Sequence, residues 1–217
     1  MSGARVIGAA GLRCSSLCRG GFFTADGARE DNRRAVEEAA ALGAPVLVLV
    51  CGPPADRDLA AARATIAAGI ERLLPFAVER GVRLGIEPLH PMMVGERSAI
   101  VTLGEALALA RSFEDPGVGV VVDAYHVFWD PRLQDELPAA RGLIAGYHVS
   151  DWLVPTPDLL AGRGLMGDGI IDLTHVGALV AATGYDGPVE VEVINPALAT
   201  VPPGELLAEV KARFARC

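Results

Sequence analysis

Near-continuous apolar runs that alternate with helix-like segments limit what this chain can fold into. Runs of this kind, rich in valine, are typical of parallel strands whose outer face is covered by helices. We expect six strands, over Leu12–Arg19, Pro45–Gly52, Val82–His90, Val118–His126, Ile144–Asp151 and Val189–Asn195. Since strands and helices alternate, the sequence predicts an α/β fold of β-α units with right-handed crossovers.

Helical periodicity marks the segments between these strands. We expect five helices, over Asp31–Leu42, Asp58–Arg80, Thr102–Phe113, Asp172–Thr183 and Gly204–Arg216. Thr102 and Glu105 have the spacing of a capping box, which predicts a helix start there. Pro75 lies inside the longest helical segment, so we expect a kink at that point.

The position of charged residues distinguishes a barrel from an open sheet. In a (β/α)8 barrel, the active site is built from the carboxyl ends of several strands, whereas an open sheet concentrates its site at one crevice. Here charged residues end four strands spread along the chain, which favours the TIM-type barrel. Six of the usual eight β-α units are present, so we interpret residues 1–217 as a single domain lacking the first two units.

Length and charge restrict the remaining choices. The 217 residues suit one domain, and the net charge of −8 would repel a phosphate backbone, so we expect no nucleic-acid partner. The four cysteines form no CxxC pair, which predicts reduced thiols and a cytoplasmic protein. Because no apolar run reaches about 18 residues, we expect no membrane partner.

Four side chains follow apolar runs at the predicted strand ends: Glu87, Asp123, His148 and Glu192. A carboxylate in such a place is costly unless a cation neutralises it. Three carboxylates and one imidazole suit a single divalent metal ion, Mn²⁺, Mg²⁺, Co²⁺ or Zn²⁺, and the oxygen-rich set favours the harder ions.

Residues beside these four have predicted roles of their own. We expect Asp151 either to orient the His148 ring or to cap its loop, and Glu190 to lie one layer deeper and pair with Arg83. The segment G-R-G-L-M-G at 162–167 follows a loop rather than a strand, which excludes a dinucleotide fingerprint and leaves a loop that holds Arg163 over the substrate. His175 is expected on a helix surface without a role.

This set of residues predicts proton transfer next to a carbonyl. A bound ion would polarise the carbonyl and adjacent hydroxyl of a small polyhydroxylated substrate. Glu87 and Glu192 would stand on either face of the acidified carbon, one removing a proton and the other returning one. The expected reaction is isomerisation or epimerisation through an enediolate.

At these residues the chain resembles the sugar phosphate isomerase/epimerase family of xylose-isomerase-like TIM barrels. The matching segments are I-E-P-L-H-P, V-D-A-Y-H-V-F-W-D-P, Y-H-V-S-D-W, G-R-G-L-M-G-D-G-I-I-D and G-Y-D-G-P-V-E-V-E. The resemblance implies that the four strand-end residues are metal ligands and that Glu87 and Glu192 are the acid/base pair. It also implies substrate contacts at His126 and Arg163, to which we add His90 and Trp152, from two of the matching segments.

Three other functions compete with this interpretation. An inosose-type dehydratase would use the same ion and bases but expel a β-hydroxyl. AP-endonuclease-like cleavage requires a richer set than the four histidines here, and the negative charge opposes it. A shortened barrel acting as a non-catalytic binding subunit is the third. Six strands would leave two unpaired edges, so we expect a homodimer or poor solubility, and a stable monomer in light scattering would contradict this.

Overall fold

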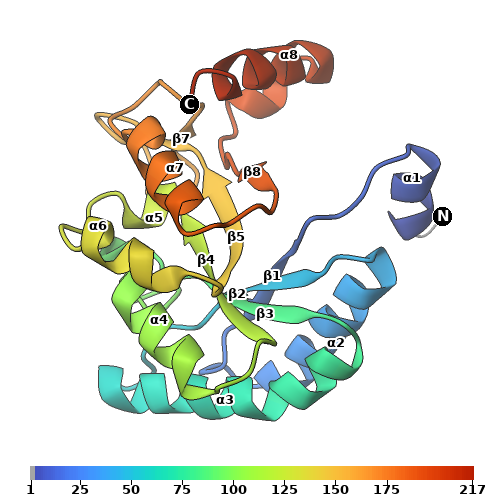
Figure 1. Ribbon diagram of the computed structural model, residues 1–217, viewed down its shortest axis with the longest axis vertical. Helices are drawn as coiled ribbons and strands as arrows, with labels where there is room; N and C mark the ends of the chain where they lie inside the picture. The colour runs from blue at the N-terminus through green and yellow to red at the C-terminus, as the bar shows by residue number, and fades with distance from the viewer. Residues whose placement is uncertain (1–2) are drawn as a thin grey trace.

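A six-stranded parallel sheet forms the centre of the molecule in the computed structural model, which describes residues 3–217 (Figure 1). Its strand order is β1-β2-β3-β4-β5-β8, and the sheet curls as an open barrel. The strands are β1 Leu17–Gly21, β2 Val46–Val50, β3 Arg83–Ile86, β4 Val118–Asp123, β5 Ile144–Val149 and β8 Val189–Val191. All six predicted strands are confirmed, each shorter than expected. The first starts at Leu17 rather than Leu12 and runs two residues past its predicted end, whereas the other five leave the sheet before their predicted ends.

Helices cover the outer face of this sheet. The five predicted helices are confirmed as α2 Ala28–Leu42, α3 Leu59–Glu79, α4 Leu103–Ser112, α7 Leu173–Ala182 and α8 Pro203–Phe214. Short elements without a periodic pattern were not predicted: α1 Gly3–Ala9, α5 Ala124–Val127, α6 Leu133–Glu136, the 3-10 turns η1 Pro91–Met93, η2 Leu137–Ala140 and η3 Leu198–Thr200, and the two-residue strands β6 Asp151–Trp152 and β7 Arg163–Gly164. The strands β6 and β7 pair antiparallel outside the main sheet.

Local signals explain where several helices start. At α4, the Thr102 hydroxyl accepts the Glu105 amide at 3.1 Å, and the Glu105 carboxylate accepts the Thr102 amide at 3.3 Å, so the predicted capping box is confirmed. At α3, Asp58 accepts the amide of Ala61 at 3.0 Å. The α3 helix continues through Pro75 from Leu59 to Glu79.

One apolar core joins the sheet to its helices. Every residue of β2 is buried, and β4 is buried throughout, as expected for strands covered on both faces. Side chains from α2, α3 and α4, such as Val36, Ile66 and Leu107, pack against this sheet in the same cluster. The core therefore fixes β2 to β5 as a rigid base for the residues at their carboxyl ends.

The sheet has two edges in the part of the chain that the structure describes, because β1 and β8 do not pair with each other. Helices α1 and α8 stand on either side of this opening and have no buried residues (Figure 1). The predicted homodimer stays a prediction. Within residues 3–217, no helix combines the length and the apolar character that crossing a membrane requires.

Candidate metal centre

The carboxyl ends of four neighbouring strands bring the predicted ligands together. Glu87 follows β3, Asp123 ends β4, His148 lies in β5 and Glu192 follows β8. These strands are adjacent in the sheet order and run parallel, so their carboxyl ends lie at one edge of the sheet. Each side chain offers one ligand atom, and these atoms all lie within 4.8 Å of one another.

The donor set fits a divalent cation. Glu87 and His148 are 3% and 2% exposed. Oε1 of Glu87 and both ring nitrogens of His148 are buried without a hydrogen-bond partner. Buried polar atoms are ordinarily paired, so such a group indicates a missing ligand. An octahedral ion with bonds of about 2.1 Å separates its ligands by about 3–4 Å, which these side chains can satisfy.

Burial and mutual charge change how these groups ionise. Burial raises the pKa of the Glu87 carboxyl above its usual value, and the nearby Glu192 and Asp123 carboxylates raise this pKa further. Burial alone would lower the pKa of His148, but the carboxylates of Glu192 and Glu87, each 3.6 Å from Nδ1, raise it to about 11. Without a metal ion, a protonated His148 therefore offsets part of the negative charge of Glu192 and Glu87.

Arg163 lies beside the same carboxylates. Its Nη1 donates to Oδ2 of Asp123 at 2.8 Å and to Oε2 of Glu192 at 2.9 Å. It also donates to the Glu192 carbonyl at 3.1 Å and to the buried Ser150 hydroxyl at 3.4 Å. The predicted substrate contact thus compensates charge in the cluster, and Ser150 is a neighbour that sequence reasoning missed, since serine at a strand end carries no distinctive signal.

His126 is held by the backbone. Its Nδ1 accepts the amide N–H of His90 at 3.2 Å, so a neutral ring must carry its proton on Nε2. Burial and the adjacent Arg163 guanidinium lower the pKa of His126 well below its usual value, which keeps the ring neutral. Nε2 lies 3.1 Å from Nη2 of Arg163, so two N–H donors face each other.

Aromatic side chains lie beside Arg163, whose guanidinium carbon is 4.5 Å from the centre of the Tyr125 ring. The rings of the predicted contacts His90 and Trp152 pack with their centroids 4.6 Å apart and their planes tilted by 31°. Trp152 also packs against Tyr125 at 4.8 Å and Phe128 at 5.5 Å. Tyr125 lies in α5, two residues after Asp123, so these rings adjoin the candidate ligands.

Of the two roles predicted for Asp151, orienting the His148 ring is wrong and capping the loop is confirmed. Asp151 accepts four backbone amides instead, from Trp152, Gly167, Gly169 and Ile171, at 2.9–3.0 Å. It therefore fixes the glycine-rich loop. A Cβ on Gly169 would stand 2.2 Å from the Trp152 carbonyl oxygen, which explains glycine at that position.

Two further expectations can be compared with the structure. Arg83 does not pair with Glu190: its guanidinium donates to the carbonyls of Gly142, Leu143 and Ile144 at 3.1–3.2 Å. His175 is exposed on α7, as predicted, and its only described role there is a backbone one, donating its amide to Asp172 at 2.9 Å.

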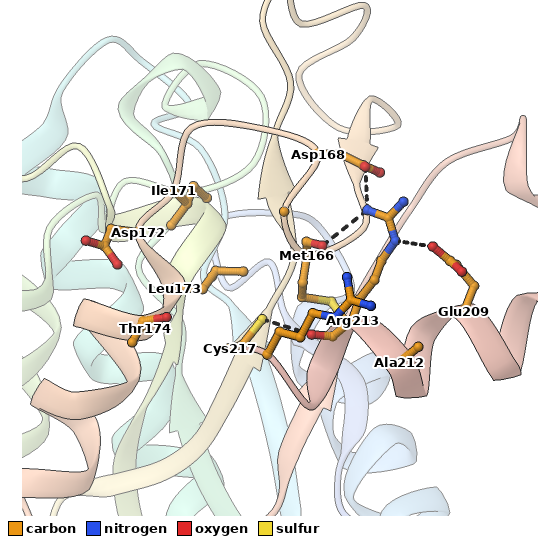
Figure 2. Close-up of a pocket in the computed structure, with 12 residues that line it drawn as sticks. Met166, Asp168, Ile171, Asp172, Leu173, Thr174, Glu209, Ala212, Arg213 and Cys217 are labelled. Carbon is orange, nitrogen blue, oxygen red and sulfur yellow. Dashed lines mark hydrogen bonds and ion pairs between the residues drawn. The ribbon is translucent and has the colours of Figure 1, made fainter.

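A cavity of about 450 Å³ lies elsewhere, between the loop after β7 and helix α8 (Figure 2). None of the four candidate ligands lines it. Figure 2 shows Arg213 reaching Asp168 and Glu209, so these three charges of the cavity pair with one another. The candidate functional site is therefore the cluster at the strand ends.

The whole described chain matches a known family. The family model for the xylose isomerase-like TIM barrel covers residues 4–217. The chain belongs to this family. This confirms both the predicted resemblance and the predicted fold class.

One curated relative of this chain is 3-dehydroshikimate dehydratase from Pseudomonas aeruginosa, which is 30% identical to it over 163 residues. The match covers 72% of this chain and 24% of that protein. The corresponding enzyme of Pseudomonas putida is 26% identical over the same shares. The chain thus spans about a quarter of the length of the curated relatives it matches.

Solved structures share the fold over nearly the whole chain. Protein SMc04130 from Sinorhizobium meliloti 1021 is 44% identical with a TM-score of 0.93, covering 99% of this chain and 82% of that one. The IolI protein with a bound zinc atom is 18% identical with a TM-score of 0.83, covering 99% and 81%. D-allulose 3-epimerase from Methylomonas sp. is 20% identical with a TM-score of 0.74, covering 98% and 80%. At 18% and 20% identity, the similarity to the last two structures shows only a shared fold.

Proposed function

We propose that this protein is a divalent-metal-dependent isomerase or epimerase that acts on a small polyhydroxylated carbonyl compound. The observation that carries the proposal is the convergence of three carboxylates and one imidazole, from four strands, within 4.8 Å. The zinc of the IolI protein and the epimerase activity named for the Methylomonas protein, both on this fold, support it.

Glu87, Asp123, His148 and Glu192 would hold the ion. When bound, a divalent ion polarises a carbonyl and the hydroxyl beside it, which acidifies the proton on the carbon between them. The three carboxylates match the harder ions Mn²⁺ and Mg²⁺, and the imidazole is compatible with Co²⁺ and Zn²⁺.

Glu87 and Glu192 supply the acid/base pair in this proposal. They come from strands separated by β4 and β5, so they approach a substrate from different directions. One carboxylate takes the proton from the carbon next to the carbonyl and leaves an enediolate, and the other returns a proton to complete the reaction. The buried, unpartnered Oε1 of Glu87 and the raised pKa of this carboxyl suit a general base.

His126 and Arg163 supply the donors for a substrate oxygen. Nε2–H of His126 and Nη2–H of Arg163 point at one another across 3.1 Å, and two donors cannot satisfy each other. A substrate oxygen to one side of these two nitrogens, about 2.9 Å from each, would accept from both. In the proposed reaction, that oxygen gains negative charge as the enediolate forms, so these donors stabilise the transition state more than the ground state.

His90 and Trp152 form the apolar side of the proposed substrate site. Their rings, with Tyr125 and Phe128 around Trp152, provide an aromatic surface of the kind that packs against the carbon skeleton of a sugar or cyclitol. Such a surface also excludes water from the carbon that loses its proton.

The dehydratase relative from Pseudomonas aeruginosa favours a second candidate function. A dehydratase would begin with the same proton abstraction, after which a hydroxyl on the β-carbon leaves as water. The two functions share the ligands and the first base, and they differ in the fate of the enediolate.

Metal binding is the first test. The protein is freed of metal with a chelator, Mn²⁺, Mg²⁺, Co²⁺ or Zn²⁺ is added back, and melting is followed in the wild type and in Glu192→Gln. We expect one ion to raise the melting temperature of the wild type and to leave the variant unchanged. No shift with any ion would overturn the proposed metal site and favour a non-catalytic binding subunit.

Product analysis in D2O then separates the reactions. An isomerase or epimerase that forms an enediolate incorporates solvent deuterium at the carbon beside the carbonyl, while the product keeps the elemental composition of the substrate. A dehydratase yields a product that has lost one water. Ketoses and inositol ketones are the substrates to screen.

A further inference from the structure

Glu190 is a charged side chain that the proposed function does not use. It lies in β8 and pairs in register with His148 of the neighbouring strand β5. Its Oε1 is 3.8 Å from Nε2 of His148. Glu190 therefore stands on the side of the imidazole that faces away from the other candidate ligands.

The two nitrogens of the His148 ring face different groups. Nδ1 lies 3.6 Å from Oε1 of Glu87 and 3.6 Å from Oε2 of Glu192, inside the ligand cluster. Nε2 is buried, has no hydrogen-bond partner, and faces the carboxylate of Glu190. A shift of the side chain by less than 1 Å would bring this contact to the usual N–H···O distance of about 2.9 Å.

The second oxygen of Glu190 is already anchored. Oε2 accepts a hydrogen bond of 3.0 Å from the hydroxyl of Ser16. Ser16 directly precedes β1, so this bond links the two edge strands of the open sheet. The anchor leaves Oε1 of Glu190 directed at His148.

We propose that Glu190 is a positioning residue that accepts the Nε2–H of His148 and thereby keeps the Nδ1 lone pair directed at the cation. The inference rests on the proposed metal site. Imidazole ligands generally donate their other N–H to a carboxylate or carbonyl, which fixes the tautomer and the ring orientation. Ser16 acts one step further out, by holding Glu190.

The alternative is that Glu190 and Ser16 only join the two sheet edges. In that case, loss of Glu190 would lower stability without changing cation affinity or the tautomer of His148. Two variants of similar size separate the cases: Glu190→Gln keeps an acceptor oxygen without the charge, whereas Glu190→Met removes the acceptor.

The affinity for Mn²⁺ is measured by calorimetry in the wild type, Glu190→Gln, Glu190→Met and Ser16→Ala. We expect the affinity to fall about 10–100-fold in Glu190→Met, the usual cost of losing such a partner, and less in Glu190→Gln. In Ser16→Ala we expect a smaller loss. If Glu190→Met does not fold, the Mn²⁺ affinities of the wild type, Glu190→Gln and Ser16→Ala still decide whether Glu190 positions His148.

The tautomer of His148 is a second readout that does not require activity. With Zn²⁺ bound, ¹⁵N NMR of the imidazole should show the proton on Nε2 in the wild type and a weakened or exchanging N–H in Glu190→Met. Wild-type affinity and an unchanged Nε2–H spectrum in the variants would overturn the role of Glu190 alone. Absence of ion binding in the wild type would overturn the metal site itself, and the role of Glu190 with it.

Discussion

Nη1 of Arg163 lies between Oδ2 of Asp123, at 2.8 Å, and Oε2 of Glu192, at 2.9 Å. These two carboxylates come from strands β4 and β8, and Arg163 comes from β7 outside the main sheet. With the carboxylate of Glu87, the cluster carries three negative charges, which one divalent ion and one guanidinium would neutralise. Arg163 thus has two proposed functions, compensating charge and donating to a substrate oxygen.

Arg163→Met should separate cation binding from catalysis. Removing one partner of a buried ion pair typically costs about 3–5 kcal/mol, so we expect the metal-free variant to melt well below the wild type. Since the cluster becomes more negative, a divalent ion should bind at least as tightly and restore much of that stability. The value of kcat/KM should fall about 100-fold or more, as when a donor to a developing oxyanion is lost.

Calorimetry with Mn²⁺, melting curves with and without the ion, and steady-state kinetics measure these effects. Glu192→Gln is the matched comparison, because it removes a proposed ligand and should lose both ion binding and activity. A variant Arg163→Met that binds the ion much more weakly than the wild type would contradict the role of Arg163 as a charge-compensating donor.

Ion binding should release a proton from His148. The Glu192 and Glu87 carboxylates outweigh the effect of burial and hold the pKa of His148 at about 11, so the ring is protonated at about pH 8 in the metal-free protein. A cation needs the Nδ1 lone pair, so about one proton should leave per ion bound. Calorimetry in buffers of different ionisation enthalpy counts this proton, and no release at about pH 8 would contradict a role for His148 as ligand.

The raised pKa of His148 also determines how the stability of the metal-free protein depends on pH. The folded-state pKa of His148 lies above the value of about 6.5 expected in the unfolded chain. Its contribution to the metal-free protein is therefore complete below about pH 6.5 and is lost as the pH rises through about 11. With the ion bound, we expect the stability to rise from about pH 6 to 8. Fewer protons then compete with the ion for Nδ1 of His148, so the ion binds more tightly. Melting curves at each pH check both trends.

The main-sheet strands and the convergence of the four candidate ligands were predictable from sequence for one physical reason. A charged residue such as Glu87 or Asp123 at the end of an apolar run marks the point where a buried strand reaches the sheet edge. Parallel strands then bring such ends together without further information. The xylose-isomerase-like segments added the family, which the match over residues 4–217 confirms.

Side-chain contacts that depend on the path of a loop or on which strands are neighbours were not predictable from sequence. Asp151 binds the amides of residues up to 20 positions away, through a loop that has no periodic pattern. The expected pair of Glu190 and Arg83 failed because β8 lies next to β5, which places Glu190 beside His148 rather than near β3. Residue types limit the chemistry of such contacts, but the register of neighbouring strands decides which pairs form.

Thr102→Ala should lower stability without touching the site. The hydroxyl of Thr102 accepts the Glu105 amide and caps α4 on the outer face of the sheet. Loss of such a cap typically costs about 1 kcal/mol, or about 2–4 °C in melting temperature for a domain of this size. Mn²⁺ affinity should equal that of the wild type, so this variant also controls for general destabilisation. A change in affinity would mean that α4 is coupled to the strand ends.

Asp151→Ala should release the glycine-rich loop and, through it, Arg163. Asp151 is 1% exposed and accepts four amides, from Trp152, Gly167, Gly169 and Ile171. An unsatisfied buried donor costs about 1–3 kcal/mol. Even if water reaches most of the four released amides, we expect a loss of about 3 kcal/mol in the free energy of unfolding.

The loop effect extends to the site because Asp151 and Trp152 in β6 pair with Gly164 and Arg163 in β7. A loosened loop places the Arg163 guanidinium less accurately, so kcat/KM should fall in Asp151→Ala but not in the control variant Thr102→Ala. The four proposed metal ligands stay in place on the main sheet. Hydrogen exchange should show faster exchange of the amides of Gly167, Gly169 and Ile171 than in the wild type. Amides that stay protected in Asp151→Ala would mean that the loop is held by other contacts, and that Arg163 owes its position to the carboxylates of Asp123 and Glu192 instead.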